Sequence, residues 1–444
     1  MPEHRGLPPP PGEGVVGEPG SEGVGAREVD RCVGSGVAAC HARRSCHNLL
    51  LRSPGVRILH TADWHLGRTF GSLSLAADQA SFVDWFVDLA QAEAVDLVVI
   101  AGDLYDRAIA PVDAIDLFGT TVRRLRAAGV LVAAITGNHD AADRVVPYAG
   151  MLDDTGFLLR GGYGAVGEVV QLDLDDGPVD LVLLPFLDPQ AAPDHLGDDP
   201  GATEGEEALL ERRRSRTHAT VLRHATARAR TRVRHRSIGV AHAFVSGGAT
   251  SDSERLLTVG GGGDVPLDVF DGFSYTALGH LHRPQAVGGP TVRYSGSPLA
   301  YSFSEEHAKS VALIEMTTTG GVDVREIPVP VGRPVRTLTG TIDDLLDPAR
   351  HPDAHGALVR AVLTDRETVI DAKVRLQGVY PYIAEIDHRR PTPASGSAES
   401  TGVLRRRISV IDAARAFWEA AEGAPPDPDT DALLVDATAE LDTQ

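Results

Sequence analysis

Cysteine is scarce in this sequence, and all three copies lie near its start. Cys32, Cys40 and Cys46 fall within the first 54 residues, so the rest of the chain contains none. A fold without cysteine cannot depend on disulfides. A histidine follows two of the cysteines, but no regular zinc-ligand spacing surrounds these pairs, and we expect no zinc site there.

Long apolar runs are also missing. No stretch approaches the roughly 20 apolar residues that a transmembrane helix needs. The chain opens with MPEHRGLPPPPGEG, which is rich in proline, glycine and glutamate and does not resemble a secretory signal. We therefore expect a cytoplasmic location and no membrane contact. Hydrophobic residues make up 42% of the chain and charged residues 23%, the profile of an ordinary globular protein.

A net positive charge is lacking as well. The formal charge of -20 at pH 7 argues against a basic nucleic-acid-binding protein. The charge is unevenly distributed, however, because ten arginines fall between Arg212 and Arg236, while the stretch after Arg415 carries only acidic charges. Bound divalent cations can also meet phosphate in an acidic protein. The arginine run has two interpretations, a solvated helix face or a contact with a nucleic-acid backbone.

The distribution of apolar residues predicts several parts. Residues 1–54 have too few periodic apolar positions to form a core, and we expect a disordered extension. From residue 56, buried strands such as VRILHT and GVLVAAI alternate with helical patterns, one of them over about residues 77–93. This alternation predicts an α/β fold with mostly parallel strands. After about residue 165, shorter alternating strands predict antiparallel pairing or a second sheet packed on the first.

Two further units are expected toward the C-terminus. An Arg- and Ala-rich helix is predicted over about residues 205–232, and a Gly/Pro/Val stretch marks a boundary near residue 330. We expect a main domain over 55–330 and a small α/β unit over 331–392. The remainder, 393–444, is expected to consist of a linker and short helices, one of them around residues 411–421.

Potential metal ligands follow five of the predicted strands. The motifs are D-W-H, G-D-L-Y-D, G-N-H-D, A-H-A-F and G-H-L-H. Ligands at the carboxyl ends of strands in such a sheet converge on one crevice. The candidate ligands are Asp63, His65, Asp103, Asn138, His242, His280 and His282.

The mixture of ligand types indicates the metal. Carboxylate, imidazole and amide ligands suit Mn²⁺, Fe²⁺ or Zn²⁺ rather than Ca²⁺, and the absence of cysteine disfavours a structural zinc site. Two ions held about 3.5 to 4 Å apart need a bridging carboxylate, and Asp103 is the candidate. Gly102, Gly137 and Gly279 stand beside the ligands and are expected to permit close approach of the backbone and the substrate.

Together these motifs resemble those of the calcineurin-like metallophosphoesterases. Within that superfamily, HTADWHLGRTF, DLVVIAGDLYDRAIAP, ITGNHDAADR, VAHAFVSGG, ALGHLHRPQ and YSGSPLAYSFSE are similar to the SbcD family of bacterial nuclease subunits. The resemblance covers roughly residues 56–390. It implies a two-sheet sandwich flanked by helices, followed by a small α/β capping domain and C-terminal helices. It also implies two bound metal ions, most often Mn²⁺.

The resemblance carries roles over to individual residues. It places one ion on Asp63, His65, Asp103 and His282, and the other on Asp103, Asn138, His242 and His280. His139 matches the family's catalytic histidine, which stabilises or protonates the leaving group; the pKa of an unperturbed imidazole, near 6.5, suits that role. Asp106 stands where archaeal members have a second catalytic histidine, so it either serves in that role or orients His139. Arg68 resembles a phosphate-contacting position, with a surface salt bridge as the alternative.

The resemblance also implies partners. The unit at 331–392 corresponds to a capping domain that positions duplex DNA, and an unrelated α/β appendage is the alternative. The C-terminal helices, with Leu433, Leu434 and Val435, correspond to a segment that docks on the coiled-coil ATPase partner, SbcC; folding back on the chain's own core is the alternative. A homodimer within a heterotetramer and a location at the nucleoid are expected on the same basis.

The expected reaction is Mn²⁺-dependent hydrolysis of DNA phosphodiesters, both from duplex ends and within single strands or hairpins. Two rival functions remain. One is another metallophosphoesterase, a phosphatase or a cyclic-nucleotide phosphodiesterase, although those enzymes lack the cap and the YSGSP segment. The other is a DNA-binding scaffold with an inactive site, which the complete set of seven ligands disfavours.

Overall fold

The computed structural model describes residues 55–147, 149–193, 216–254, 263–389, 411, 414–415, 418–419 and 424–439. The predicted N-terminal extension, the first part of the predicted helix over 205–232 and most of the segment 393–444 lie outside these residues. The chain divides into two compact units. The first contains residues up to Thr69, Ser74–Ala300 and His307–Gly332, and the second contains Phe70–Leu73, Tyr301–Glu306 and the residues from Arg333 onward.

The first sheet of unit 1 has the strand order β14-β13-β1-β4-β5-β6. Its strands are β1 (Val56–Thr61), β4 (Leu97–Ala101), β5 (Leu131–Ile135), β6 (Phe157–Arg160), β13 (Ser310–Met316) and β14 (Val322–Pro328). The four strands from β1 to β6 in this order pair in parallel, as the sequence predicts, while β13 and β14 add an antiparallel edge.

The second sheet has the order β11-β12-β10-β9-β8-β7. Its strands are β7 (Val170–Leu174), β8 (Gly177–Leu184), β9 (Arg236–His242), β10 (Tyr275–Gly279), β11 (Gln285–Ala286) and β12 (Val292–Tyr294). The second of the two predicted arrangements, another sheet packed on the first, is therefore the one formed. Antiparallel pairing is confined to its edges, because β8, β9, β10 and β12 pair in parallel.

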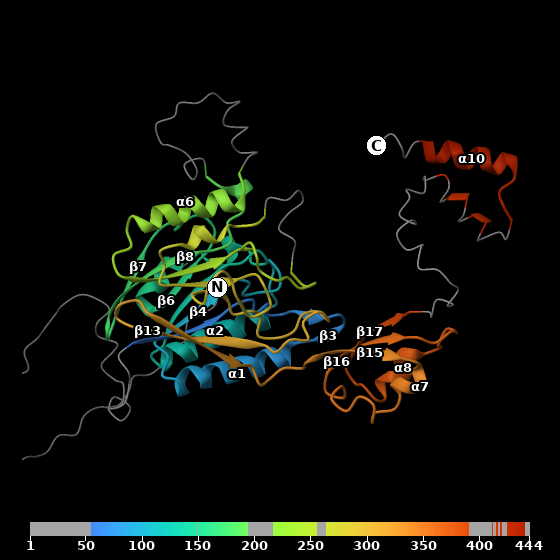
Figure 1. Cartoon of the computed structure of the whole chain (residues 1–444), viewed down its shortest axis with the longest axis horizontal. Coiled ribbons are helices and arrows are strands. Elements are labelled where there is room, and N and C mark those ends of the chain that lie inside the picture. Colours follow the sequence, from blue (N-terminus) through green and yellow to red (C-terminus); the bar gives the residue numbers. More distant parts are fainter. Residues whose placement is uncertain are drawn as a thin grey trace, which may run out of the picture. The chain divides into compact units, whose positions relative to one another are not determined.

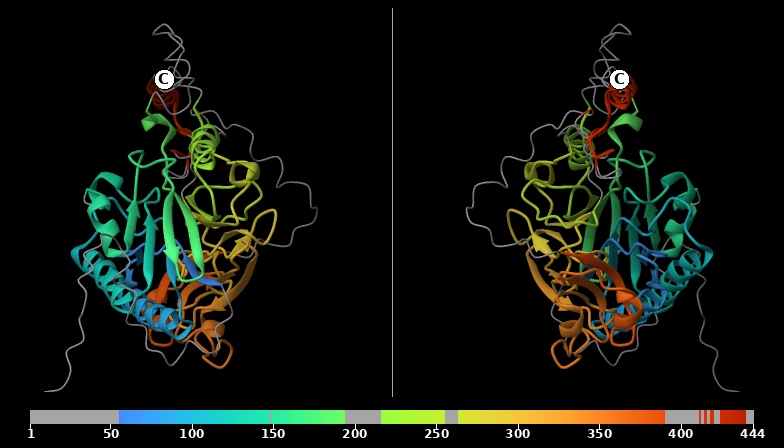
Figure 2. Two further views of the ribbon diagram at one scale, coloured as in Figure 1. Left: turned by 90° about the vertical axis from the view of Figure 1, so that its left-hand side faces the viewer. Right: turned by 90° about the vertical axis from the view of Figure 1, so that its right-hand side faces the viewer.

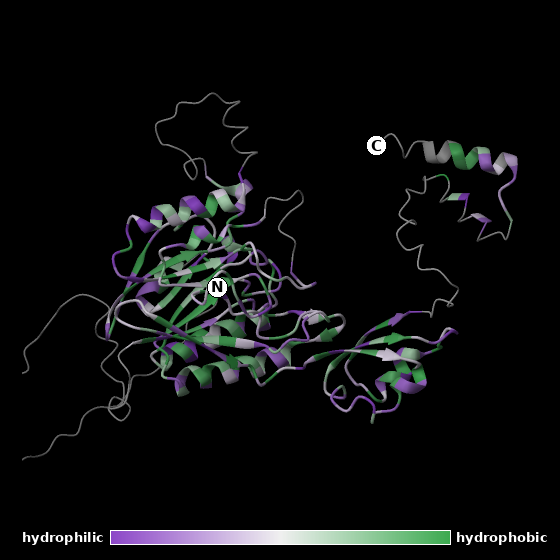
Figure 3. Ribbon diagram, viewed as in Figure 1, coloured by the Kyte–Doolittle hydropathy of each residue, from purple (hydrophilic) through white to green (hydrophobic). Residues whose placement is uncertain are grey.

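The two sheets pack face to face between helices (Figures 1 and 2). Side chains from both sheets form one buried layer, in which Ile58, Val99 and Ala133 of the first sheet meet Leu181 and Val240 of the second. Figure 3 shows the apolar residues concentrated on these strands. This layer supplies the main hydrophobic stabilisation of unit 1, since burial of apolar surface is the dominant favourable term in folding.

Helices cover the outer faces of both sheets. The first sheet is covered by α1 (Ala76–Ala92) and α2 (Val112–Ala127), and the second by α6 (His218–Arg230). Phe82 and Phe86 of α1 pack edge-on against Trp64, at ring distances of 5.4 and 5.6 Å. The short helices of unit 1 are α3 (Ala142–Val145), α4 (Ala149–Leu152), η2 (Asp153–Thr155), η3 (Pro189–Ala191) and η4 (Leu267–Phe270).

Unit 2 is a small α/β structure with its own core. Three parallel strands, β15 (Val335–Gly340), β16 (Leu358–Leu363) and β17 (Ile383–His388), lie in that order, accompanied by α7 (Ile342–Leu345) and α8 (Ala372–Gln377). Leu338, Val359, Leu376 and Tyr380 are buried together in it. The chain also forms the hairpin of β2 (Thr69–Phe70) and β3 (Leu73–Ser74), and the predicted terminal helix is present as α10 (Pro428–Ala439). None of the helices in the described ranges is long and apolar enough to cross a membrane.

Candidate metal centre

The structure brings all seven predicted ligands to one end of the sandwich in unit 1. Loops after β1, β4 and β5 of the first sheet supply four of them, and the ends of β9 and β10 in the second sheet supply the other three. The buried apolar strands fix where each loop begins. The ligands are Asp63 and His65 after β1, Asp103 after β4, Asn138 after β5, His242 at the end of β9, and His280 and His282 after β10.

One group of donors combines Asp63, His65 and His282. Their ligand atoms lie within 4.8 Å of one another, and all three residues are buried. The Nε2 atoms of His65 and His282 are 3.2 Å apart. This group contains three of the four residues of the first predicted set, whose fourth member is Asp103.

A second group surrounds the amide of Asn138. Its Oδ1 lies 2.9 Å from Nε2 of His242 and 3.2 Å from Nδ1 of His280. Asp103 stands between the two groups, because its Oδ2 is 3.5 Å from Nε2 of His65 and also 3.5 Å from Nε2 of His242. Asp63, expected in the first group alone, also lies within reach of Asp103 and His242.

The electrostatics of this donor set fit divalent cations. Burial, together with the neighbouring Asp103 carboxylate, raises the pKa of Asp63 well above its usual range. Burial lowers the pKa of His242 to about 4, so its imidazole is neutral at pH 7. Neutral imidazoles beside carboxylates can bind a cation, and the cation offsets the repulsion between the carboxylates. The same residues could therefore hold two ions.

The glycines beside the ligands are required for close packing within the site. A Cβ on Gly137 would lie 2.1 Å from Oδ1 of Asp103, and one on Gly102 would lie 2.2 Å from Nδ1 of His242. Gly102 also has a φ of 92°, a conformation that costs glycine little. At Gly137 and Gly102 the groups that approach closely are ligand side chains, and the expected approach of the substrate stays a prediction.

His139 is oriented by a hydrogen bond to Asp106, which lies in the loop after β4. Its Nδ1 donates to the backbone carbonyl of Asp106 over 2.7 Å. The carboxylate of Asp106 does not make this bond; it pairs with Arg68 at 3.1 Å and lies 3.9 Å from Nδ1 of His65. Of the two interpretations of Arg68, the salt bridge is thus present, although Asp106 is only 20% exposed and the pair adjoins the ligands.

Gln79 of α1 holds the first ligand loop and was not predicted from the sequence. Its Oε1 accepts from the backbone N–H of Gly67 at 3.0 Å, and its Nε2 donates to the carbonyl of His65 at 2.8 Å. The signal was its position: Gln79 lies three residues before Phe82 on the apolar side of the helix, where a polar residue needs a partner.

Asp140 is a second unpredicted residue that shapes the site. Its carboxylate accepts from three backbone N–H groups, those of Leu104, Tyr105 and Gly137, at 2.8 to 3.0 Å. These bonds join the Asp103 loop to the Asn138 loop. Burial and the nearby Asp103 raise the pKa of Asp140 to about 7. The G-N-H-D motif contained this residue, but two of its partners belong to a loop some 36 positions earlier and could not be identified from the motif.

Ser253 and Glu254 position His282 through hydrogen bonds. The Oγ of Ser253 is 2.7 Å from Nδ1 of His282, and Oε1 of Glu254 accepts from the backbone N–H of His282 at 2.7 Å. Hydrogen bonds to the second imidazole nitrogen fix the tautomer and the orientation of a ligating histidine. Nothing in the sequence around these residues indicated this role.

The described part of the arginine run is largely engaged within unit 1. Arg223 pairs with Asp268 at 2.7 Å, Arg230 donates to the carbonyl of Val269 and Arg232 to that of Gly167. Arg236 pairs with Asp176 and is buried. Arg223, Arg230 and Arg232 are nevertheless exposed, as expected of a solvated face, whereas a contact with a nucleic-acid backbone stays a prediction.

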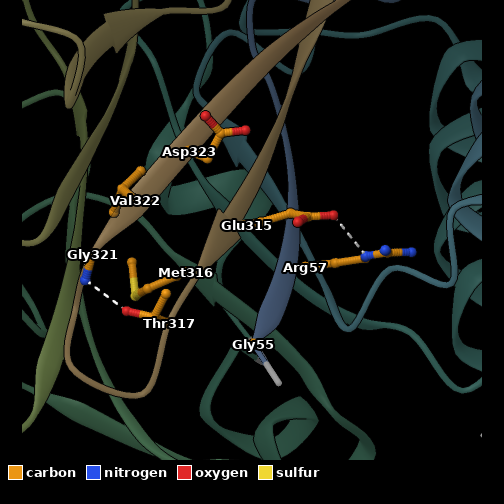
Figure 4. A pocket seen from close by; sticks show the side chains of 8 residues that line it. All are labelled: Gly55, Arg57, Glu315, Met316, Thr317, Gly321, Val322 and Asp323. Atoms are coloured by element: carbon orange, nitrogen blue, oxygen red, sulfur yellow. Dashed lines mark hydrogen bonds and ion pairs between the residues drawn. The ribbon is translucent and has the colours of Figure 1, made fainter. Parts of the chain in front are cut away.

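A separate cavity of about 380 Å³ lies at the start of β1 (Figure 4). Asp63 and His65 follow the opposite end of that strand. The lining of the cavity includes Arg57, Glu315, Met316 and Asp323. None of the predicted site residues lines it.

Two family models match this chain. The calcineurin-like phosphoesterase model matches residues 56–284, a range that contains all seven ligands. A model named SbcD_C and described as the type 5 capsule protein repressor C-terminal domain matches residues 331–422.

Similar solved structures include TT1561 of Thermus thermophilus, at 13% identity and a TM-score of 0.32, with 61% of this chain and 99% of that one covered. A dimetal phosphatase from Danio rerio is similar at 14% identity and a TM-score of 0.35, with the same coverage.

Proposed function

Because the chain belongs to the calcineurin-like phosphoesterase family, it is a metal-dependent hydrolase of phosphate esters, and we propose that it cleaves DNA as the nuclease subunit of an SbcCD-type complex. The observation that carries this proposal is that the seven candidate ligands lie together in a chain whose C-terminal unit matches SbcD_C. We infer both exonuclease action on duplex ends and endonuclease action on single strands and hairpins.

The residues of the site have distinct roles in this proposal. Asp63, His65 and His282 would hold one ion, Asn138, His242 and His280 would hold the other, and Asp103 would contribute to both. Bound Mn²⁺ ions supply Lewis-acid stabilisation of the phosphate and activate a water molecule. Because the carbonyl of Asp106 holds Nδ1–H of His139, Nε2 of His139 is the atom that delivers a proton to the leaving sugar oxygen.

Partners are proposed from exposed apolar residues. Ile109, Val112 and Ile115, at the loop before α2 and on its first turn, are 68%, 71% and 49% exposed. Exposed apolar side chains that lie close together commonly mark protein interfaces, and we assign this group to a homodimer contact. Leu433 of α10 is 71% exposed, and we assign α10 to docking on a coiled-coil ATPase of the SbcC type.

Nuclease assays on blunt duplex, hairpin and single-stranded DNA with Mn²⁺ or Mg²⁺ test this proposal, with and without the ATPase partner. We expect Mn²⁺-dependent cleavage that EDTA abolishes. Hydrolysis of phosphomonoesters or cyclic nucleotides without any DNA cleavage would favour the phosphatase alternative, and metal-independent DNA binding without hydrolysis would favour the scaffold.

Calorimetry on Asp103→Ala tests the bridge. We expect neither ion to bind tightly, because the variant removes a ligand from both groups, whereas the exposed Asp116→Ala should still bind two. Two ions bound to Asp103→Ala with unchanged affinity would overturn the bridging assignment.

A further inference from the structure

We propose that Phe186, His218 and Phe244 form a stacking subsite for an unpaired nucleobase beside the scissile phosphate. This inference rests on the proposed DNA nuclease function. It identifies the part of the substrate, a nucleobase, that contacts one side of the metal centre.

The three rings lie around the His242 and His280 side of the site. Phe186 is 5.3 Å from the ring of His218 and 6.4 Å from that of His242. On the other side, Phe244 is 6.5 Å from the ring of His280, and His242 and His280 are themselves 5.4 Å apart. Five aromatic rings therefore continue one after another from His218 to Phe244.

These three rings are more exposed than the ligands that they adjoin. His242 and His280 are buried, whereas Phe186, His218 and Phe244 are all partly exposed. The opposite side of the site is polar, since His139, Arg68 and Asp106 lie beside His65 there. An apolar surface on one side and a charged one on the other match a nucleotide, which has a flat base on one side of its sugar and a phosphate on the other.

The rings are held by the fold. The backbone N–H of Phe186 donates to the carbonyl of Thr136 at 2.9 Å, directly before the Asn138 loop. Phe244 packs on the buried cluster between α6 and the second sheet. His218 is the first residue of α6, whose N-terminus has a capping box formed by Thr217 and Thr220. Rings fixed in this way lose little conformational freedom when a ligand stacks on them.

The chemistry favours an unpaired base of any identity. Every nucleobase has a π face, so stacking on aromatic side chains tolerates different sequences. In an intact duplex both faces of a base are covered by its neighbours, whereas frayed ends, single strands and hairpin loops expose them. The subsite would thus direct cleavage to such positions without reading the sequence.

Abasic scanning of a single-stranded oligonucleotide tests the proposal. In the wild-type protein with Mn²⁺, we expect an abasic residue at one nucleoside flanking the cleaved bond to lower kcat/KM about tenfold, the effect of losing one stacked base. Phe186→Leu retains apolar volume but removes the aromatic face. It should lower kcat/KM on the normal oligonucleotide by a similar factor and show little further loss on the abasic one, and Phe186→Tyr should restore the wild-type pattern.

Phe273→Ala is the matched control, because Phe273 is also a partly exposed phenylalanine of unit 1, packed against Gly239. It should leave the abasic penalty unchanged. If Phe186→Leu showed the same abasic penalty at that nucleoside as the wild type, the subsite would be overturned and the nuclease proposal would stand. Failure of the wild-type protein to cleave any oligonucleotide, with phosphomonoester hydrolysis retained, would instead overturn the nuclease function and the subsite with it.

Discussion

His139 is the residue at which the proposed chemistry can be separated from metal binding. Its side chain bonds to the carbonyl of Asp106 and is not among the seven ligands. We expect His139→Ala to bind Mn²⁺ and DNA normally while kcat falls about 10²- to 10⁴-fold, the usual contribution of a positioned acid. Calorimetry and a hairpin-cleavage assay measure the two properties. His224→Ala, at an exposed position of α6, is the control, and cleavage by His139→Ala at the wild-type rate would remove His139 from the mechanism.

Gln79 illustrates a residue that acts through the backbone. Both of its amide atoms bind the loop between His65 and Gly67. We expect Gln79→Ala to weaken Mn²⁺ binding about 10- to 100-fold, the usual effect of removing a group that supports a ligand, with cleavage partly recovered at high Mn²⁺ concentration. Exposed Gln91 on the same helix provides the control variant, Gln91→Ala. Unchanged affinity in Gln79→Ala would show that the loop holds its shape without this side chain.

Single residues also mark the limit of sequence reasoning about the site. The ligands could be predicted because each follows an apolar strand within a short motif, as Asp103 does after LVVIA. The partners of Gln79 and Asp140 could not, because they are backbone groups of other loops, some 14 positions away for Gln79 and 36 for Asp140. Such contacts depend on how elements pack, which local patterns do not specify.

At the scale of elements, the strands and covering helices were the most predictable parts. Buried apolar runs identified β1, β4 and β5, and the spacing of Phe82 and Phe86 identified α1. The pairing of the second sheet was harder to predict. Its short strands suggested antiparallel pairing, but the segments between β8, β9 and β10 are long enough to cross over and give parallel pairs.

One buried histidine connects the two sheets and makes their packing sensitive to pH. His60 of β1 lies 3.0 Å from the hydroxyl of Tyr275 in β10, and burial lowers the pKa of His60 to about 3. Between pH 3 and 6.5 the unfolded chain binds a proton at this position that the folded chain does not. The free energy of unfolding therefore falls as the pH drops below 6.5, by about 2 kcal/mol at pH 5 from this group alone.

Urea unfolding of wild type and His60→Gln at pH 7.5 and 5.0 measures this contribution. We expect the variant to lose less stability than the wild type over that interval, by about 2 kcal/mol. Other buried histidines titrate in both proteins. The difference between the stability losses of wild type and variant therefore gives the contribution of His60. Identical pH dependence would show that His60 does not resist protonation in the folded state.

At the scale of the whole molecule, the proposed metal centre and the exposed apolar residues before and on α2 are assigned to different partners. Arg223 and Arg236 of the arginine run pair with Asp268 and Asp176 within unit 1, and we expect the proposed metal ions to contact the phosphates of the substrate. Ile109, Val112 and Ile115 offer a surface for a second protein chain.

The dimer proposed for this surface predicts a clear change in mass. Val112→Glu combined with Ile115→Glu should convert a dimer to a monomer in sedimentation equilibrium, because two charges would be buried without partners. Met151→Glu is the control, because Met151 is an apolar residue on α4 that is 78% exposed and lies outside the proposed surface. A wild-type protein that remains monomeric at high micromolar concentration would contradict the assignment.

The ligands come from both sheets of the sandwich: Asp63, Asp103 and Asn138 from one, His242 and His280 from the other. Ions bound there would link the two sheets, which are otherwise held together by side-chain packing and by hydrogen bonds such as that between His60 and Tyr275. Their stabilising effect would grow with the logarithm of the free metal concentration. A cell's supply of manganese would then influence how long the protein survives as well as how fast it works.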